Sequence, residues 1–124
     1  MKNCPKCGSN WEQIQTPIAD YEKCTGCGGL WLDHYEVEPL SPIADSIDDG
    51  DKAIGKQNNS IDRISCPVCP NNPLIRMVDA KQPHIWYEKC HTCGGMYFDA
   101  GEFSDLATFD LSDFFKKLRT KERI

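Results

Sequence analysis

The stretch YEKCTGCGGLWLD (21–33) returns with few changes as YEKCHTCGGMYFD (87–99) in a chain of 124 residues. Both copies contain Tyr-Glu-Lys-Cys, a second cysteine three places on, a Gly-Gly pair and a closing aspartate. A phrase repeated in this way indicates one structural unit used twice, each copy built around its cysteines. Units of about forty residues bury too little apolar surface to fold alone, so a disulfide, a metal or a partner is required.

All eight cysteines fall into four Cys-x-x-Cys pairs, and none is left over. Sixteen residues separate the first two pairs, and twenty separate the last two. Two pairs about 15–20 residues apart are typical of a zinc ribbon. Four thiolates complete a tetrahedron around Zn²⁺ and leave no open position, so each site is predicted to be structural. The predicted ligands are Cys4, Cys7, Cys24 and Cys27 at site 1, and Cys66, Cys69, Cys90 and Cys93 at site 2.

The start of the chain, MKNCPKCGSN, lacks the hydrophobic core of a signal peptide. No apolar run is long enough to span a bilayer. We therefore expect a cytoplasmic protein without a membrane partner. Thiols stay reduced in the cytosol, which favours metal sites over disulfides.

Paired cysteines have two further uses besides structural zinc binding. A thioredoxin-like redox motif needs a βαβ pattern, which the sequence lacks. Iron, as in a rubredoxin-like electron carrier, stays an alternative because tetrahedral sulfur suits both metals. We expect two Zn²⁺ ions. Because four sulfurs complete each site, His34, His84 and His91 are expected to face solvent.

The residues between paired cysteines are predicted to form β-hairpins. A short apolar run after each second pair predicts a third strand that covers the flank of the metal site. Trp31 and Tyr97 occupy matching positions in these runs and are interpreted as core residues. The hairpin strands are expected at 11–16, 19–24, 74–80 and 85–90, and the third strands at 30–32 and 96–98.

Each copy then continues with an aspartate and, three places later, a glutamate. Asp33 with Glu36, and Asp99 with Glu102, predict helix N-termini of the capping-box type. Pro39 is expected to end the first helix, and the second is expected over 101–109. Capping explains these carboxylates without a substrate, so no residue is assigned a catalytic role.

This pattern resembles the TFIIB-type zinc-ribbon family, also called transcription-factor zinc-finger domains. The resemblance implies a zinc-binding ribbon and says little about partners. Pro70 departs from the usual glycine, and Tyr97-Phe98 replaces Trp-Leu. The matching residues in the first half are Cys4, Pro5, Cys7, Gly8, Cys24, Cys27, Gly28, Gly29, Trp31, Leu32, Asp33 and Glu36. In the second half they are Cys66, Pro67, Cys69, Cys90, Cys93, Gly94, Gly95, Asp99, Gly101, Glu102 and Leu106.

The predicted fold class is a small metal-stabilised α+β protein with two tandem zinc ribbons, each of three strands and a short helix. Ribbon 1 is assigned to 1–40, a polar linker to 41–64, ribbon 2 to 65–106 and an amphipathic C-terminal helix to 107–124. Ser41-Pro42 predicts a short helix at the start of the linker, and 48–60 is predicted to be flexible. The relative orientation of the ribbons stays open.

The C-terminal segment places Leu111 and three further apolar residues on one helical face. Phe114, Phe115 and Leu118 are the candidate partner-binding residues, for another protein or for a second copy of the chain.

Charge bears on the partner. The formal net charge is −5, and eight thiolates with two zinc ions would bring it to about −9. Neither ribbon contains the basic stripe on which phosphate binding depends, which disfavours nucleic acid. We expect a non-enzymatic zinc-binding protein, and we interpret it as a protein-interaction module. A nucleic-acid-binding transcription accessory factor is the alternative.

Overall fold

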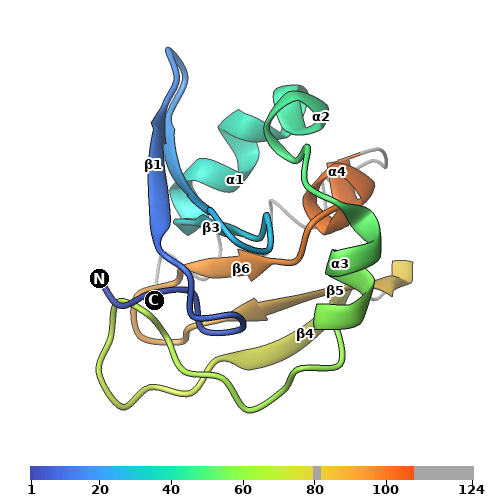
Figure 1. The fold of residues 1–124 in the computed structure, drawn as a ribbon. Coiled ribbons are helices and arrows are strands. Elements are labelled where there is room, and N and C mark those ends of the chain that lie inside the picture. The colour runs from blue at the N-terminus through green and yellow to red at the C-terminus, as the bar shows by residue number, and fades with distance from the viewer. Residues whose placement is uncertain (80–81, 108–124) are drawn as a thin grey trace.

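The computed structural model describes residues 1–79 and 82–107. Its centre is one six-stranded antiparallel sheet with the strand order β1-β2-β3-β6-β5-β4 (Figure 1). The strands are β1 (Trp11–Gln15), β2 (Asp20–Cys24), β3 (Leu30–Leu32), β4 (Ile75–Asp79), β5 (Gln82–Lys89) and β6 (Met96–Phe98). The helices are α1 (His34–Leu40), the 3-10 turn η1 (Ser41–Ile43), α2 (Ala44–Ile47), α3 (Lys52–Asn58) and α4 (Glu102–Ala107).

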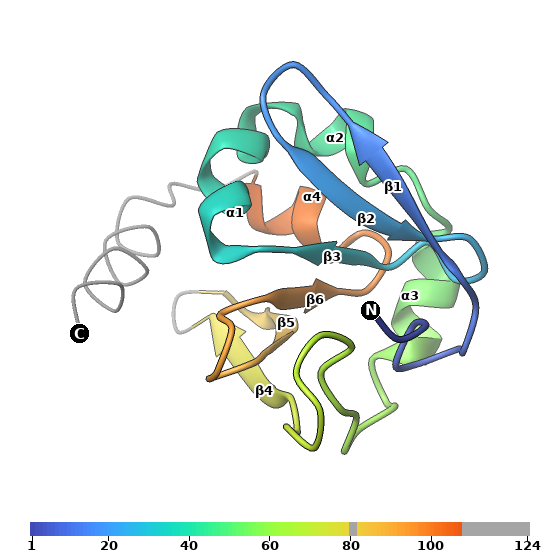
Figure 2. The ribbon, with the colours of Figure 1, turned by 90° about the vertical axis from the view of Figure 1, so that its left-hand side faces the viewer.

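The two ribbons join through their third strands, β3 and β6, which lie side by side in the middle of the sheet (Figures 1 and 2). The pairing is antiparallel, and Trp31 is opposite Tyr97. These two residues also match in the repeat. The pairing therefore relates ribbon 1 to ribbon 2 by an approximate two-fold axis, the arrangement of a symmetric dimer within one chain.

The three residues of each central strand are all buried because the sheet is covered on both faces. Side chains alternate between faces along a strand. Leu30 and Leu32 belong to one apolar cluster together with Phe98, whereas Trp31 and Tyr97 belong to a second cluster with the cysteines. One face therefore carries α1, α2 and α4, and the other carries the metal sites.

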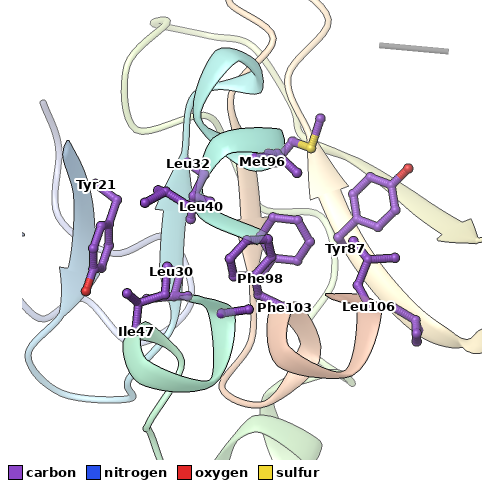
Figure 3. Packing of buried hydrophobic residues seen from close by; sticks show 13 residues of the cluster. Tyr21, Leu30, Leu32, Leu40, Ile47, Tyr87, Met96, Phe98, Phe103 and Leu106 are labelled. Carbon is purple, nitrogen blue, oxygen red and sulfur yellow. The ribbon is translucent and has the colours of Figure 1, made fainter. Parts of the chain in front are cut away.

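Helices α1, α2 and α4 gather over the first face (Figure 2). Phe98 lies at the centre of this layer, with its ring centroid 5.2 Å from that of Phe103 and 5.6 Å from that of Tyr87 (Figure 3). Burying a side chain of this size contributes about 1.5–3 kcal/mol to folding. Among the described residues, no helix has both the length and the apolar character needed to cross a membrane.

The segment between the ribbons is ordered, so the prediction of a flexible stretch over 48–60 is wrong. Helix α3 occupies Lys52–Asn58, capped by the Asp51 side chain at Ala53 N. Gly55 lies so close to the backbone of Ala100 that no side chain fits there. The linker is held by such contacts with ribbon 2, which sequence composition does not reveal.

Helix α1 is short, as expected, but Pro39 lies inside it and the helix ends one residue later. Ser41-Pro42 then begins η1, and α2 follows, in agreement with the predicted short helix. Of the predicted C-terminal helix, residues 108–124 lie outside the described residues, and with them the candidate partner-binding residues Phe114, Phe115 and Leu118.

Candidate metal centres

Three of the four Cys-x-x-Cys pairs sit in tight turns closed by two backbone hydrogen bonds. In the first turn, Gly8 N donates to Cys4 O and Cys4 N donates to Ser9 O, at 2.9 Å each. The turns that begin at Cys24 and Cys90 repeat this pattern. The glycine after the second cysteine has φ near +78° in these three turns, a conformation that glycine adopts without strain.

The fourth turn differs, as Pro70 predicts. Proline has no N–H to donate to Cys66 O, and its ring excludes a positive φ. The positive φ moves one place on, to Asn71 at +59°. Cys66 N then donates to Asn72 O at 2.8 Å, one residue farther along than in the other turns. The extra residue absorbs the proline and leaves the sulfurs in place.

The structure brings the eight predicted ligands together in two groups of four. Within each group, all sulfurs lie within 4.8 Å of one another. Cys4 Sγ is 3.9 Å from Cys27 Sγ, Cys7 Sγ is 3.3 Å from Cys24 Sγ, and Cys66 Sγ is 3.8 Å from Cys93 Sγ. A tetrahedron with Zn–S near 2.3 Å has edges of about 3.8 Å. The donor sets therefore fit zinc, which when bound cross-links the turns of each ribbon.

The closely spaced sulfurs of site 1 shift one another's pKa values. A hydrogen bond from Cys4 lowers the pKa of Cys27 to about 4, and the same contact raises the pKa of Cys4. Burial raises the pKa of Cys24 to about 11. Thiols so close together resist ionising at once unless a positive charge lies between them. A dication supplies that charge.

Backbone N–H groups support the sulfurs at both sites. Gly26 N and Cys27 N donate to Cys24 Sγ, at 3.4 and 3.5 Å. At site 2, Val68 N and Cys69 N donate to Cys66 Sγ, at 3.4 and 3.3 Å. Such bonds orient the ligands and reduce the charge on the thiolates.

Aromatic residues of each ribbon reach the metal turns of the other. A side chain on Gly29 would overlap the hydroxyl end of Tyr97, and one on Gly95 would overlap the indole of Trp31. The expectation that Trp31 and Tyr97 are core residues is confirmed. The core, however, is shared between the ribbons and lies between their metal sites.

A buried ion pair crosses the same interface and was not predicted. Lys6 lies within the first Cys-x-x-Cys, and its side chain is 0% exposed. Its Nζ is 2.8 Å from Glu88 Oε1 and 2.6 Å from Asp99 Oδ2. It also donates to Asn58 O at 3.0 Å, at the end of α3. The sequence around Lys6 did not predict its burial or its ion pairs, because the partners are distant in sequence.

The two predicted capping boxes have different outcomes. Asp33 accepts from Tyr35 N, and Glu36 accepts from Asp33 N, so the first box is confirmed. The second is wrong, because the carboxylate of Asp99 contacts Lys6. Asp48 instead accepts from the N–H groups that begin α4, those of Gly101 and Ser104, both at 2.8 Å.

The expectation that all histidines face solvent is wrong for His34. Its side chain is 17% exposed and lies over Gly94 in the second ribbon. Ala100, at the matching position of ribbon 2, lies over Gly28 in the same way. His91 is exposed, as predicted, and the side chain of His84 lies outside the described residues.

Comparison with known proteins agrees with this geometry. The sequence model of the family described as transcription factor zinc-finger, the TFIIB-type zinc ribbon, matches residues 3–41 and again 65–108. No curated protein matched the chain, and neither did any solved structure. The two matches together cover more than half of the chain and include all eight cysteines of the two zinc sites. The chain therefore belongs to the TFIIB-type zinc-ribbon family and carries two tandem copies of its domain.

Proposed function

We propose that the protein is a non-enzymatic module that binds a protein partner through a surface held in shape by its two zinc ions. Each site has four cysteine ligands, which complete tetrahedral zinc and leave no position for a substrate. Zinc in such a site contributes to folding, here of a small sheet with short helices. A scaffold of this kind suits the rigid presentation of side chains.

The observation that carries this proposal is that three basic side chains are bound by groups of the chain itself. Lys6 is buried between two carboxylates. Arg76 Nη2 donates to Asn59 O at 2.6 Å and to Ile61 O at 3.1 Å. At the surface, Lys23 pairs with Asp49, whose side chain is 61% exposed. These three cations have partners within the chain, and the net charge is negative, whereas nucleic-acid affinity depends on Lys and Arg that reach phosphates.

A nucleic-acid-binding accessory of transcription is the second candidate function. The family description, transcription factor zinc-finger, favours it. The basic residues of the C-terminal segment, among them Lys116 and Lys117, are its sequence support. Contacts made by these residues would weaken steeply with salt.

The test is affinity capture with the zinc-loaded full chain from nuclease-treated lysate of its native host. We expect one protein at fixed stoichiometry, captured equally at low and high salt. Phe114→Ser with Phe115→Ser removes the apolar face predicted from sequence and is expected to abolish capture. Lys116→Gln with Lys117→Gln is the matched control on the same segment and is expected to retain it.

Three outcomes count against the proposal. One is saturable binding of duplex DNA or RNA in fluorescence anisotropy at physiological salt, lost in the Lys116→Gln and Lys117→Gln variant; it would favour the second candidate. Another is light scattering that shows a dimer, with the phenylalanine variant monomeric. That result would assign the apolar face to a second copy of the chain. The third is turnover of a substrate that survives in both variants.

A further inference from the structure

Tyr97 belongs to ribbon 2, but its hydroxyl lies against the sulfurs of ribbon 1. The side chain is fully buried. Its oxygen is 3.2 Å from Cys27 Sγ and 3.6 Å from Cys4 Sγ. A hydroxyl has a single proton, so Cys27, at the shorter distance, is the acceptor. The bond joins the two halves of the chain at a metal ligand.

The surroundings of Tyr97 hold the hydroxyl in this position. Gly29 leaves the room that the phenol needs, because any side chain there would overlap it. Lys6 Nζ lies 5.2 Å from the centroid of the ring, and the Trp11 ring meets it edge-on with centroids 6.2 Å apart.

Site 2 has a different neighbour at the corresponding place. Trp31 lies against Gly95 through carbon atoms of its six-membered ring, which donate no hydrogen bond. At site 2, the backbone N–H groups of Val68, Cys69 and Gly95 donate hydrogen bonds to the sulfurs. Within the described residues, no side chain other than a cysteine does so. Two of the four cysteines of site 2 are half-buried, whereas three of the four at site 1 are buried and the fourth, Cys7, is exposed.

We propose that Tyr97 is an outer-sphere hydrogen-bond donor to metal site 1, through which ribbon 2 controls how firmly ribbon 1 holds its zinc. A hydrogen bond to a thiolate disperses the negative charge of the four sulfurs and maintains the orientation of the ligand. Residues in this position change metal affinity about 10–100-fold in other proteins. Site 1 is therefore the slowly exchanging centre, and site 2 exchanges faster.

The test follows both sites separately in the full-length protein. Zinc-loaded protein is challenged with ¹¹³Cd²⁺, and the growth of two ¹¹³Cd resonances is recorded by NMR after assignment through the cysteine β-protons. In the wild type we expect the resonance of site 2 to grow first. Tyr97→Phe removes only the hydroxyl and is expected to shift the resonance of site 1 and to speed its appearance about tenfold.

Tyr21→Phe is the matched control. Tyr21 is a buried tyrosine of ribbon 1 whose side chain lies in the apolar cluster on the helix face of the sheet. Its substitution removes a hydroxyl from ribbon 1, which holds site 1, but does not alter a contact with the sulfurs. Both resonances are therefore expected to stay unchanged. Equal effects of the two variants would assign the change to general loosening and overturn the proposal.

A second measurement needs no variant and keeps the proposal testable if Tyr97→Phe fails to fold. In the wild-type cadmium form, the Tyr97 hydroxyl proton is expected to exchange slowly and to show a scalar coupling to the metal of site 1. A hydroxyl without that coupling, or a wild type in which site 1 exchanges first, would refute the assignment. A site 1 resonance that is unmoved by Tyr97→Phe would do the same.

Discussion

Ribbon 1 and ribbon 2 end their shared phrase with the same aspartate, and the two carboxylates have different partners. The Asp33 side chain caps its own helix, and Asp33 N donates to the Glu36 side chain, which completes the capping box. Asp99 lies opposite the buried amine of Lys6, which comes from the other ribbon. The helix after Asp99 is capped by Asp48 from the linker.

This difference has a geometric origin. The pairing of β3 with β6 gives the ribbons equivalent positions, so Trp31 and Tyr97 make matching contacts. The linker occurs once, and its Asp48 and Gly55 contact ribbon 2. Lys6 has its counterpart in Val68, which is 50% exposed. Symmetry is therefore broken where the single linker contacts the two copies differently, or where a residue of one copy has no equivalent in the other.

The largest expected effect tests whether the two ribbons fold as one unit. Cys90→Ser removes a buried ligand of site 2, and we expect dispersed amide signals to be lost from both ribbons. Structural zinc contributes about 10–16 kcal/mol in small domains, which exceeds the stability of most of them. The measurements are ¹H–¹⁵N correlation spectra and metal analysis of protein purified without added zinc.

His91→Ser, at the neighbouring exposed position, is the control for Cys90→Ser and is expected to retain two zinc ions. Ribbon 1 could instead keep its spectrum and one zinc in the Cys90→Ser protein. The shared sheet would then be dispensable for site 1, and the two ribbons would be independent domains.

The next effect concerns the unmatched lysine. Lys6→Met leaves two buried carboxylates without their cation, which is expected to cost about 3–5 kcal/mol. Val68→Met changes the corresponding exposed position of ribbon 2 and is expected to cost less than about 0.5 kcal/mol. Thermal unfolding of the zinc-loaded variants measures both. Similar melting temperatures for the two proteins would show that the buried ion pair contributes nothing to the asymmetry.

A smaller effect separates the two helix caps. Asp48→Ala removes two buried hydrogen bonds at the start of α4 and is expected to cost about 2 kcal/mol. Asp33→Ala removes one exposed bond at the start of α1 and is expected to cost about 1 kcal/mol. Chemical denaturation with zinc present compares them. The reverse order would mean that Asp33, not the linker residue, provides the stronger cap.

The smallest effect depends on pH and involves the capping box of ribbon 1. Burial raises the pKa of Glu36, the hydrogen bond from Asp33 N lowers it, and the acidic neighbours Glu22, Asp33 and Asp20 add smaller increases, so that the pKa moves from 4.5 to about 7. A raised pKa means that the fold favours the neutral carboxyl. Its contribution is complete below pH 4.5 and is lost as the pH rises through about 7.

Glu36→Gln keeps the acceptor oxygen but does not ionise. Because the site is partly exposed, we expect the variant to be about 1 kcal/mol more stable than the wild type at pH 8, with the difference vanishing by about pH 5. Glu38→Gln, on the exposed side of the same helix, is the control. Unfolding curves of the zinc-loaded proteins across this range provide the measurement, and a difference independent of pH would contradict the assignment.

Much of the fold and site follows from local sequence. The third strands lie at the predicted residues, and the hairpin strands agree within a few residues. Pro70 predicted the altered turn, and the Asp33 box was found as expected. These features depend on neighbours within about six positions, where backbone chemistry constrains the chain directly. The Lys6–Asp99 and Asp48–Gly101 contacts join residues 93 and 53 positions apart, and no local pattern marks them.

The sequence by itself determined the metal ligands, the turns that present them and the family, because Cys-x-x-Cys spacing and glycine placement act over a few residues. Only the tertiary structure decided that the ribbons share one sheet and that the linker caps ribbon 2. It also placed the hydroxyl of Tyr97 beside the sulfurs of site 1. The physical reason is the antiparallel pairing of two short apolar strands. Its register directs the middle residue of each strand toward the metal site of the other ribbon.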